Sequence, residues 1–138
     1  MSATDLVLPR LAIEEGRRKF PYRDTKGLLT IGVGVNLDAG LDDEEIDWLL
    51  RHRVDKVRKQ LEQFEWYTAL DDVRQSVFLD LGFNMGVATL LHFTETIASV
   101  IHKDWQAAHD RLLASKWHKD VGDGRALPLA QMLLTGVA

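Results

Sequence analysis

The stretch from Glu15 to Gly34, EGRRKFPYRDTKGLLTIGVG, constrains the fold and chemistry of this chain more than any other. Glu15 stands at the end of an apolar run that is typical of a helix. Asp24 falls in a turn-rich segment, and Thr30 falls in a short β-type run that ends in glycines. Two carboxylates on different rigid elements, with a hydroxyl nearby, can divide the work of an acid and a base. The stretch therefore predicts an acid–base pair held by a helix end and a hairpin.

Composition restricts the function classes that the chain can belong to. Its 138 residues, 46% of them hydrophobic and 28% charged, are typical of one globular domain with a real core. The net charge of −4 argues against a nucleic-acid partner, since phosphate binding usually requires a basic excess. There is no cysteine, and the histidines show no HExxH or comparable spacing, so we expect no metal site.

Periodicity predicts a helical N-terminus, a small sheet and then a long helix. Residues 3–15 are expected to form the first helix, and residues 20–35 an antiparallel hairpin sheet punctuated by proline and glycine. Asp42 and Glu45 have the spacing of a capping box, which predicts a helix over about 42–64. Apolar residues then recur at steps of three and four, which indicates a core stripe: Ile46, Leu50, Val54, Val57, Leu61 and Phe64.

Capping signals predict further helices in the second half of the chain. Asp72 with Gln75 indicates the start of a buried helix over Val73–Met85. Thr94 and Asp104 are expected as N-caps, residues 121–124 as a loop, and residues from about 125 to 134 as the last helix. Trp117 closes the segment before this last part of the chain and is interpreted as a core residue.

The ordered set of motifs resembles the phage-type, T4-like lysozymes, an endolysin family of glycoside hydrolases. That family's pattern is a Glu-Gly at the end of the first helix, followed by Tyr-x-Asp-Thr-x-Gly-x-x-Thr-Ile-Gly-x-Gly. Here the pattern reads Glu15-Gly16, then residues 22–27 as YRDTKG and residues 30–34 as TIGVG. The resemblance covers roughly residues 8–135 and continues, in the family's order, through residues 73–86, Phe93-Thr94, Trp105, Ala107-Ala108 and Ser115-Lys116-Trp117.

The resemblance implies an α+β fold, predominantly α, in a single lysozyme-like domain over residues 1–138. Such a fold has two lobes, with a small N-terminal antiparallel β-hairpin sheet and a helical C-terminal lobe joined by a long inter-lobe helix. Transferred to this chain, the small lobe spans about 14–41, the linking helix about 42–64, and the helical lobe about 65–138 together with the N-terminal helix.

The resemblance also implies a muramidase that hydrolyses the β-1,4 bond between N-acetylmuramic acid and N-acetylglucosamine, with inversion and without a cofactor. Glu15 would be the general acid, because partial burial where the helix meets the sheet would keep it protonated. Asp24, in a polar turn, would act as base or stabilise positive charge at the anomeric carbon, and Thr30 would hold the attacking water. Asn84, Met85 and Gly86 match the segment that faces the sugars.

Arg125 matches an arginine that lies near the acidic site residue in the family. It would orient Glu15 or contact the substrate, so we count it with Asn84, Met85 and Gly86 as substrate-binding. The simpler interpretations stay open: Glu15 would then cap a helix or pair with Arg125, and Asp24 would only form an Asx turn.

The implied partner is the glycan of peptidoglycan, bound by a monomer without nucleic acid or stable membrane insertion. The N-terminus has neither a basic start nor an uninterrupted apolar run, so no signal peptide is expected. Synthesis in the cytoplasm (of the host, for a phage protein) and action on the wall after release are therefore expected. A basic cluster around the hairpin would attract an anionic glycan or simply be a solvated face: Arg17, Arg18, Lys19, Arg23 and Lys26.

The sequence allows two alternatives to a muramidase, and it departs from the family's pattern at some positions. One alternative is a non-catalytic wall-binding or virion structural module, which would not need Glu15, Asp24 and Thr30 together. The other is a chitinase-like glycosidase or a lytic transglycosylase, which needs only the acid. Val35 stands where many members have a histidine, and Arg53 stands where its acidic partner would lie. The linker before the second lobe is also short for the family.

Overall fold

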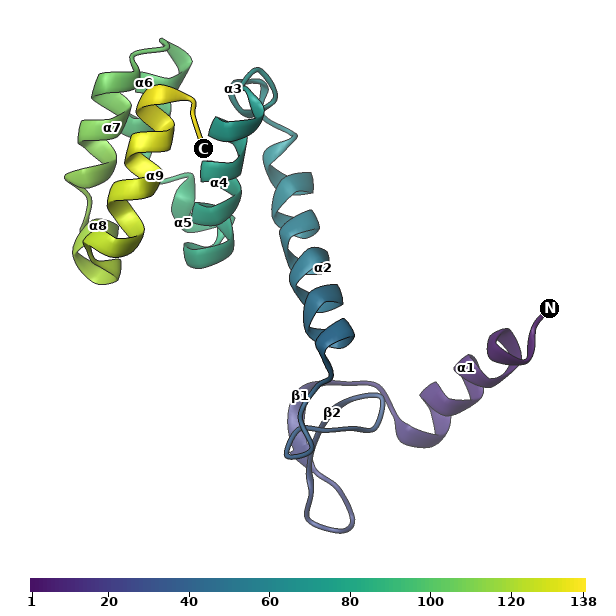
Figure 1. Ribbon diagram of the computed structural model, residues 1–138. Helices are drawn as coiled ribbons and strands as arrows, with labels where there is room; N and C mark the ends of the chain where they lie inside the picture. The colour runs from purple at the N-terminus through teal and green to yellow at the C-terminus, as the bar shows by residue number, and fades with distance from the viewer. The chain divides into compact units, whose positions relative to one another are not determined.

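A computed structural model describes residues 1–138, which divide into two compact units, Met1–Trp48 and Leu49–Ala138. The boundary falls inside α2 (Asp43–Leu61) (Figure 1). The first unit holds one helix and the whole sheet, and the second is entirely helical after α2. The predicted α+β class, mostly α with a small antiparallel sheet, is confirmed, whereas the lobe boundaries proposed above remain a prediction.

The first helix, α1 (Ala3–Glu15), has the bounds that the sequence predicts. It begins with a capping box, in which the Ser2 side chain accepts from the Asp5 N–H and the Asp5 carboxylate accepts from the Ser2 N–H. The helix continues through Pro9, which has no N–H to give to the preceding turn. Gly16, with φ of 76°, ends it and turns the chain towards the sheet.

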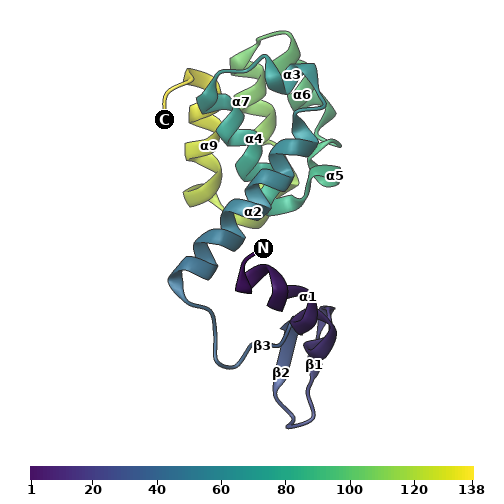
Figure 2. The same ribbon diagram turned by 90° about the vertical axis from the view of Figure 1, so that its right-hand side faces the viewer.

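The sheet consists of β1 (Arg18–Arg23), β2 (Leu29–Gly32) and β3 (Val35–Asn36) in the order β1-β2-β3, antiparallel throughout. Figure 2 shows β1 and β2 as the two arms of a hairpin. In the register Tyr22 lies opposite Thr30, and an irregularity separates this pair from the pairing of Arg18 with Gly32. The predicted hairpin sheet over residues 20–35 is thus confirmed.

The long helix α2 starts at the predicted capping box. Asp42 accepts from the Glu45 N–H at 2.8 Å, and Glu45 accepts from the Asp42 N–H at 3.0 Å. The predicted apolar stripe is a core stripe only in its C-terminal part. Leu61 is fully buried, whereas Ile46 near the start is 50% exposed.

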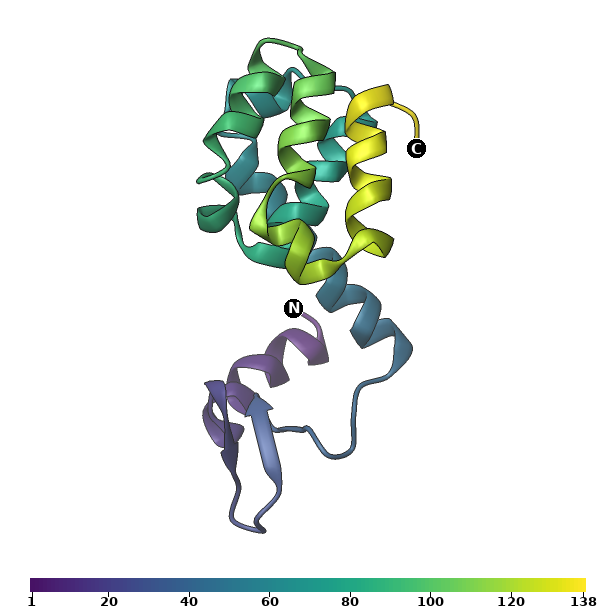
Figure 3. The same ribbon diagram turned by 90° about the vertical axis from the view of Figure 1, so that its left-hand side faces the viewer.

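The second unit is a bundle of short helices around one apolar core. Helices α7 (Trp105–Leu113) and α9 (Asp123–Thr135) lie side by side in Figures 1 and 3. The core includes Phe78, Leu81, Leu112 and Leu133. None of the helices combines the length and the apolar character that a membrane span requires. The helices are α3 (Glu65–Thr68), α4 (Asp72–Met85), α5 (Val87–Leu90), α6 (Thr94–Ile101), α7 (Trp105–Leu113), α8 (Lys116–Val121) and α9 (Asp123–Thr135).

Three predicted helix boundaries need correction, and one is confirmed. The N-cap of α4 is Asp71, whose carboxylate accepts from the Arg74 N–H; the predicted cap, Asp72, is already the first helical residue. Thr94 is likewise the first residue of α6 rather than its cap. The last helix begins at Asp123, because Gly122 alone, at φ of 82°, makes the turn. Asp104 caps α7 as predicted.

Candidate active site

Asp24 forms the start of the β1–β2 turn. Its Oδ1 atom accepts hydrogen bonds from the backbone N–H groups of Lys26 and Leu28, both at 2.8 Å. Its own N–H donates to the Leu28 carbonyl, and its carbonyl accepts from the Gly27 N–H. One carboxylate oxygen therefore holds the turn, while Oδ2 has no partner in the protein and is left for a solvent or ligand hydrogen bond.

Thr30 lies two pairs further along the hairpin. Because Tyr22 is opposite Thr30 and Asp24 is bonded to Leu28, the register makes Asp24 and Thr30 diagonal neighbours on one face. Thr30 is only 4% exposed, and its hydroxyl donates to the Leu28 carbonyl at 2.9 Å. The Oγ1 lone pairs remain able to accept a hydrogen bond from water.

Glu15, the last residue of α1, extends over the β2–β3 turn. A Cβ atom built on Gly34 would lie 2.9 Å from Glu15 Oε2, so the carboxylate occupies the space that a side chain would fill. Gly34 also has φ of 68°, which favours glycine. The partial burial expected for Glu15 is not found, since the residue is exposed. The fold thus brings the helix end and the hairpin together in Met1–Trp48.

Asn84 and Gly86 lie at the end of α4, in the second unit. The Asn84 Oδ1 atom accepts from the Trp117 indole Nε1–H at 2.8 Å, so the amide nitrogen of Asn84 is left to donate elsewhere. Trp117 is 6% exposed, which confirms it as a core residue. Gly86, with φ of 85°, ends α4 and precedes α5, where its N–H donates to the Gly82 carbonyl.

Met85 lines a cavity of about 660 Å³ that the sequence does not predict. The side chain itself packs partly against the core. Arg111 is fixed in this cavity by hydrogen bonds from Nη1 to the Glu95 carbonyl and the Ser99 hydroxyl, each 2.8 Å. Because these residues come from separate helices, no local motif could have brought them together. The other polar and ionisable lining residues are Thr89, His92, Thr94, Thr96, Ser115, Lys116 and Asp120.

Arg125 has a partner that sequence reasoning missed. Its Nη2 atom donates to Asp80 Oδ1 at 2.7 Å, and both side chains are about two-fifths exposed. The two residues also line a cavity of about 350 Å³ with Leu50, Val54 and Phe83, among others. No sequence pattern predicts this ion pair, because its two residues are 45 positions apart in the chain.

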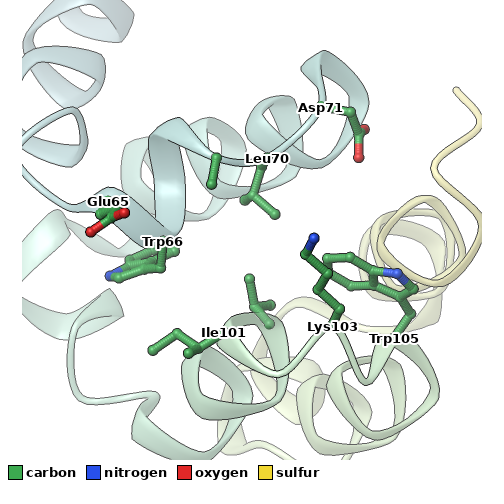
Figure 4. Close-up of a pocket in the computed structure, with 9 residues that line it drawn as sticks. Glu65, Trp66, Leu70, Asp71, Ile101, Lys103 and Trp105 are labelled. Carbon is green, nitrogen blue, oxygen red and sulfur yellow. The ribbon is translucent and has the colours of Figure 1, made fainter.

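A further cavity, of about 630 Å³, lies among α3, α6 and α7 (Figure 4). Trp66 and Trp105 stand at its two ends, Leu70 lies between them, and the Lys103 side chain points towards the Trp105 end. Trp66 also makes an edge contact with Phe78, with ring centroids 5.0 Å apart. Neither indole is among the expected catalytic or substrate-binding residues, so this cavity is not assigned to the site.

The predicted site residues therefore fall into two sets. Glu15, Asp24 and Thr30 lie in Met1–Trp48, and the four expected substrate-binding residues lie in Leu49–Ala138. No three His, Asp or Glu side chains come together as a metal site would require. The chemistry that the first set can perform is proton transfer and charge stabilisation by two carboxylates, with a hydroxyl close to one of them.

One comparison with known families bears on this arrangement. Residues 12–131 match the family model described as phage lysozyme. The matched range contains Glu15, Asp24, Thr30 and all four expected substrate-binding residues.

Proposed function

This chain belongs to the phage lysozyme family and is a peptidoglycan hydrolase of lysozyme type, and we propose that Glu15 and Asp24 carry its reaction. The bond cleaved would be the β-1,4 bond between N-acetylmuramic acid and N-acetylglucosamine. The glycosidic oxygen would take a proton from Glu15, while Asp24 works on the opposite face of the sugar. No cofactor is required for this chemistry.

The position of Glu15 supports the role of general acid. Glu15 is the last residue of a capped helix, which fixes its backbone. Its carboxylate lies next to Gly34 in the β2–β3 turn. Glu15 has no ion-pair partner, so its carboxyl group is free to meet the glycosidic oxygen of a bound glycan.

The hydrogen bonds of Asp24 carry the proposal. Two backbone N–H groups hold Oδ1, while Oδ2 stays free to accept a hydrogen bond from an attacking water. Thr30, its diagonal neighbour, would accept a second hydrogen bond from that water. Attack by a water that lies between the carboxylate and the sugar leads to inversion. In inverting glycosidases generally, the two carboxyl groups are about 6.5–9.5 Å apart, which leaves room for this water.

Asn84 supports recognition of the N-acetyl group. With Oδ1 bonded to Trp117, the side-chain amide is oriented and can donate from nitrogen to the acetyl carbonyl of a sugar. Gly86 would allow the glycan to approach the backbone, and Met85 would give an apolar contact. Arg125, held by Asp80, would hydrogen-bond to the substrate with the guanidinium N–H groups that Asp80 does not use.

The test is clearing of a turbid suspension of chloroform-treated Gram-negative cells. We expect wild type to clear the suspension, and Glu15→Gln and Asp24→Asn to lose clearing at equal folded content measured by circular dichroism. Glu14→Gln and Asp38→Asn are matched controls, because both acids are exposed and neither has an ion-pair partner. The anomer first released, followed by NMR, then reports inversion or retention.

The same assay separates the alternatives. Binding of wild type to cells without clearing would replace the enzyme by a wall-binding module. Clearing by Asp24→Asn, with release of anhydro-sugar ends, would leave Glu15 as the acid of a lytic transglycosylase. Equal loss of clearing in Glu14→Gln and Glu15→Gln would show that a general electrostatic effect, rather than proton donation by Glu15, is at work.

A further inference from the structure

We propose that strand β1 and its turn form a docking surface for a linear phosphodiester polymer attached to the bacterial wall. This surface, the basic edge, is defined by Arg17, Arg18, Lys19, Arg23 and Lys26. All five side chains are exposed, and none forms an ion pair. The location of such a polymer in the wall rests on the proposed function; the affinity of the basic edge for it does not.

Charge distribution is the first argument. The whole chain carries a net charge of −4, yet the segment from Arg17 to Lys26 contains a single acid, Asp24. Elsewhere several arginines are neutralised by carboxylates, as Arg58 is by Glu62 and Arg125 is by Asp80. The cations of the basic edge keep their full charge for a partner outside the chain. A local field of this kind attracts an anion whatever the net charge.

Geometry is the second argument, and it selects a linear partner. β1 is at the edge of the sheet, so only its β2 side is hydrogen-bonded. A strand of six residues extends up to about 20 Å. In its regular part Tyr22 and Arg23 point to opposite faces, and the Arg18 guanidinium lies against the Tyr22 ring. Arg18 and Arg23 are therefore on opposite faces of the strand. A polymer lying along the edge can meet cations from both faces, whereas a flat membrane surface would meet only one.

The chemistry of the cations favours phosphate. Arginine binds phosphate oxygens through paired N–H groups, and lysine adds a compact point charge. Two of the arginines are already oriented: the Arg18 guanidinium lies 4.8 Å from the Tyr22 ring centroid, and Arg23 donates to the Gly27 carbonyl at 3.1 Å. Arg23 thereby belongs to the same turn as Asp24, so a docked polymer would concentrate the enzyme near the glycan that it cleaves.

A simpler role for the basic edge makes the opposite prediction. Charged residues and a proline on an edge strand prevent pairing with other sheets, and β1 contains Lys19 and Pro21. That role gives no affinity for a soluble polymer. Phe20, which is 78% exposed, is the feature that a membrane partner would use, so it serves as a diagnostic residue.

The experiment measures binding of purified, glycan-free poly(glycerol phosphate) by fluorescence anisotropy over a series of salt concentrations. The test variant is Arg17→Gln, Lys19→Gln, Lys26→Gln, whose side chains make no hydrogen bond or ion pair in the fold. The control variant, Lys56→Gln, Lys59→Gln, Lys119→Gln, removes the same charge from exposed sites in the second unit. Folded content is matched by circular dichroism.

We expect the affinity of the test variant to fall by about tenfold at low salt, and the slope of log affinity against log salt to fall by about two. The control variant should change affinity less than twofold. Equal losses in both variants, or no measurable binding by wild type, would overturn the proposal. The proposal would also be overturned if wild type bound only phosphatidylglycerol vesicles and Phe20→Ala abolished that binding. This result would assign the basic edge to a membrane. Hydrolysis of polymer-free glycan is measured separately. Failure of the proposed reaction can therefore be distinguished from failure of polymer binding.

Discussion

The Glu15 carboxylate lies where a side chain on Gly34 would have to be: a Cβ there would be 2.9 Å from Oε2 and 3.1 Å from Cδ of Glu15. The end of α1 and the β2–β3 turn therefore fit closely together, with the Glu15 carboxylate in the space left by the missing side chain of Gly34. The glycine is needed for this proximity and also for its backbone angle, since φ is 68°. Gly34 is thus a positioning residue for the proposed general acid.

Gly34→Ala is expected to lower hydrolytic activity about a hundredfold, because the added methyl group displaces the Glu15 carboxylate by an ångström or so. Activity is measured by the initial rate of cell clearing, and stability by urea unfolding. Gly40→Ala is the matched control: φ is 79°, and nothing lies within 4 Å of the added Cβ. It should suffer the same backbone strain, of about 1–2 kcal/mol, with activity retained. Equal activity in the two variants would remove Gly34 from the site.

Gly82→Ala is expected to destabilise the protein by about 1–3 kcal/mol, since its Cβ would lie 2.6 Å from Val57 Cγ1 and overpack the contact between α2 and α4. Gly124→Ala, also in a helix but with nothing within 4 Å, should be neutral or stabilise by about 0.4–1 kcal/mol. Urea unfolding of both variants is the measurement. Stabilisation by both would mean that helix propensity outweighs the close packing of Gly82.

Arg74→Lys is expected to cost about 2–3 kcal/mol, because lysine cannot replace the fork of hydrogen bonds that arginine makes. Arg74 donates from Nε to the Leu133 carbonyl at 2.8 Å and from Nη2 to the Leu134 carbonyl at 3.0 Å. Its guanidinium also lies 3.8 Å from the Trp105 ring centroid. In the control Arg58→Lys, the ion pair that changes is solvent-exposed, so the loss of stability should be much smaller. Thermal and urea unfolding would both report the difference.

His118 gives the protein a pH-dependent stability. Its pKa is raised above the usual 6.5, first because Nδ1 donates to the Leu113 carbonyl and second because Nε2 donates to the Asp123 carboxylate. A raised pKa means that the folded state binds the proton more tightly than the unfolded state. The stabilisation is therefore fully present below pH 6.5 and is lost as pH rises through the higher, folded-state pKa.

The check is urea unfolding of wild type and His118→Gln at about pH 5.5 and about pH 8.5. Wild type should exceed the variant by more at the acidic pH, and Asp123→Asn should reduce that excess. His102→Gln, at an exposed position in the second unit, is the matched control. An excess that is equal at both pH values would contradict the assignment.

Local chemistry explains which elements could be predicted. The capping boxes at Ser2 and at Asp42 use residues three apart, so the sequence contains the whole interaction. The start of α4 is one residue off because Asp71 and Asp72 are both good caps and only the fold selects one. The start of α9 is missed because two nearby glycines indicate a loop, whereas only Gly122 adopts a left-handed angle.

The site could be predicted only as far as its motif extends. Asp24 and Thr30 lie within seven residues, so register alone makes them neighbours. The contacts of Asn84 with Trp117 and of Arg125 with Asp80 span 33 and 45 residues. Such pairs depend on how whole helices pack, which periodicity does not specify. The exposure of Glu15 shows the same limit, because a burial estimate requires neighbours from elsewhere in the chain.

The unequal bonding of the two oxygens of Asp24 limits what can replace it. Asparagine keeps an oxygen for the Lys26 and Leu28 N–H groups, so the turn can persist while the free oxygen becomes an amide nitrogen. Alanine would remove both functions, and glutamate, one methylene longer, would no longer fit the two turn bonds. The two oxygens of this side chain therefore have different tasks, one in the turn and the other in the proposed reaction. On the proposed mechanism, a single exchange of oxygen for nitrogen leaves a lysozyme that is folded but inert.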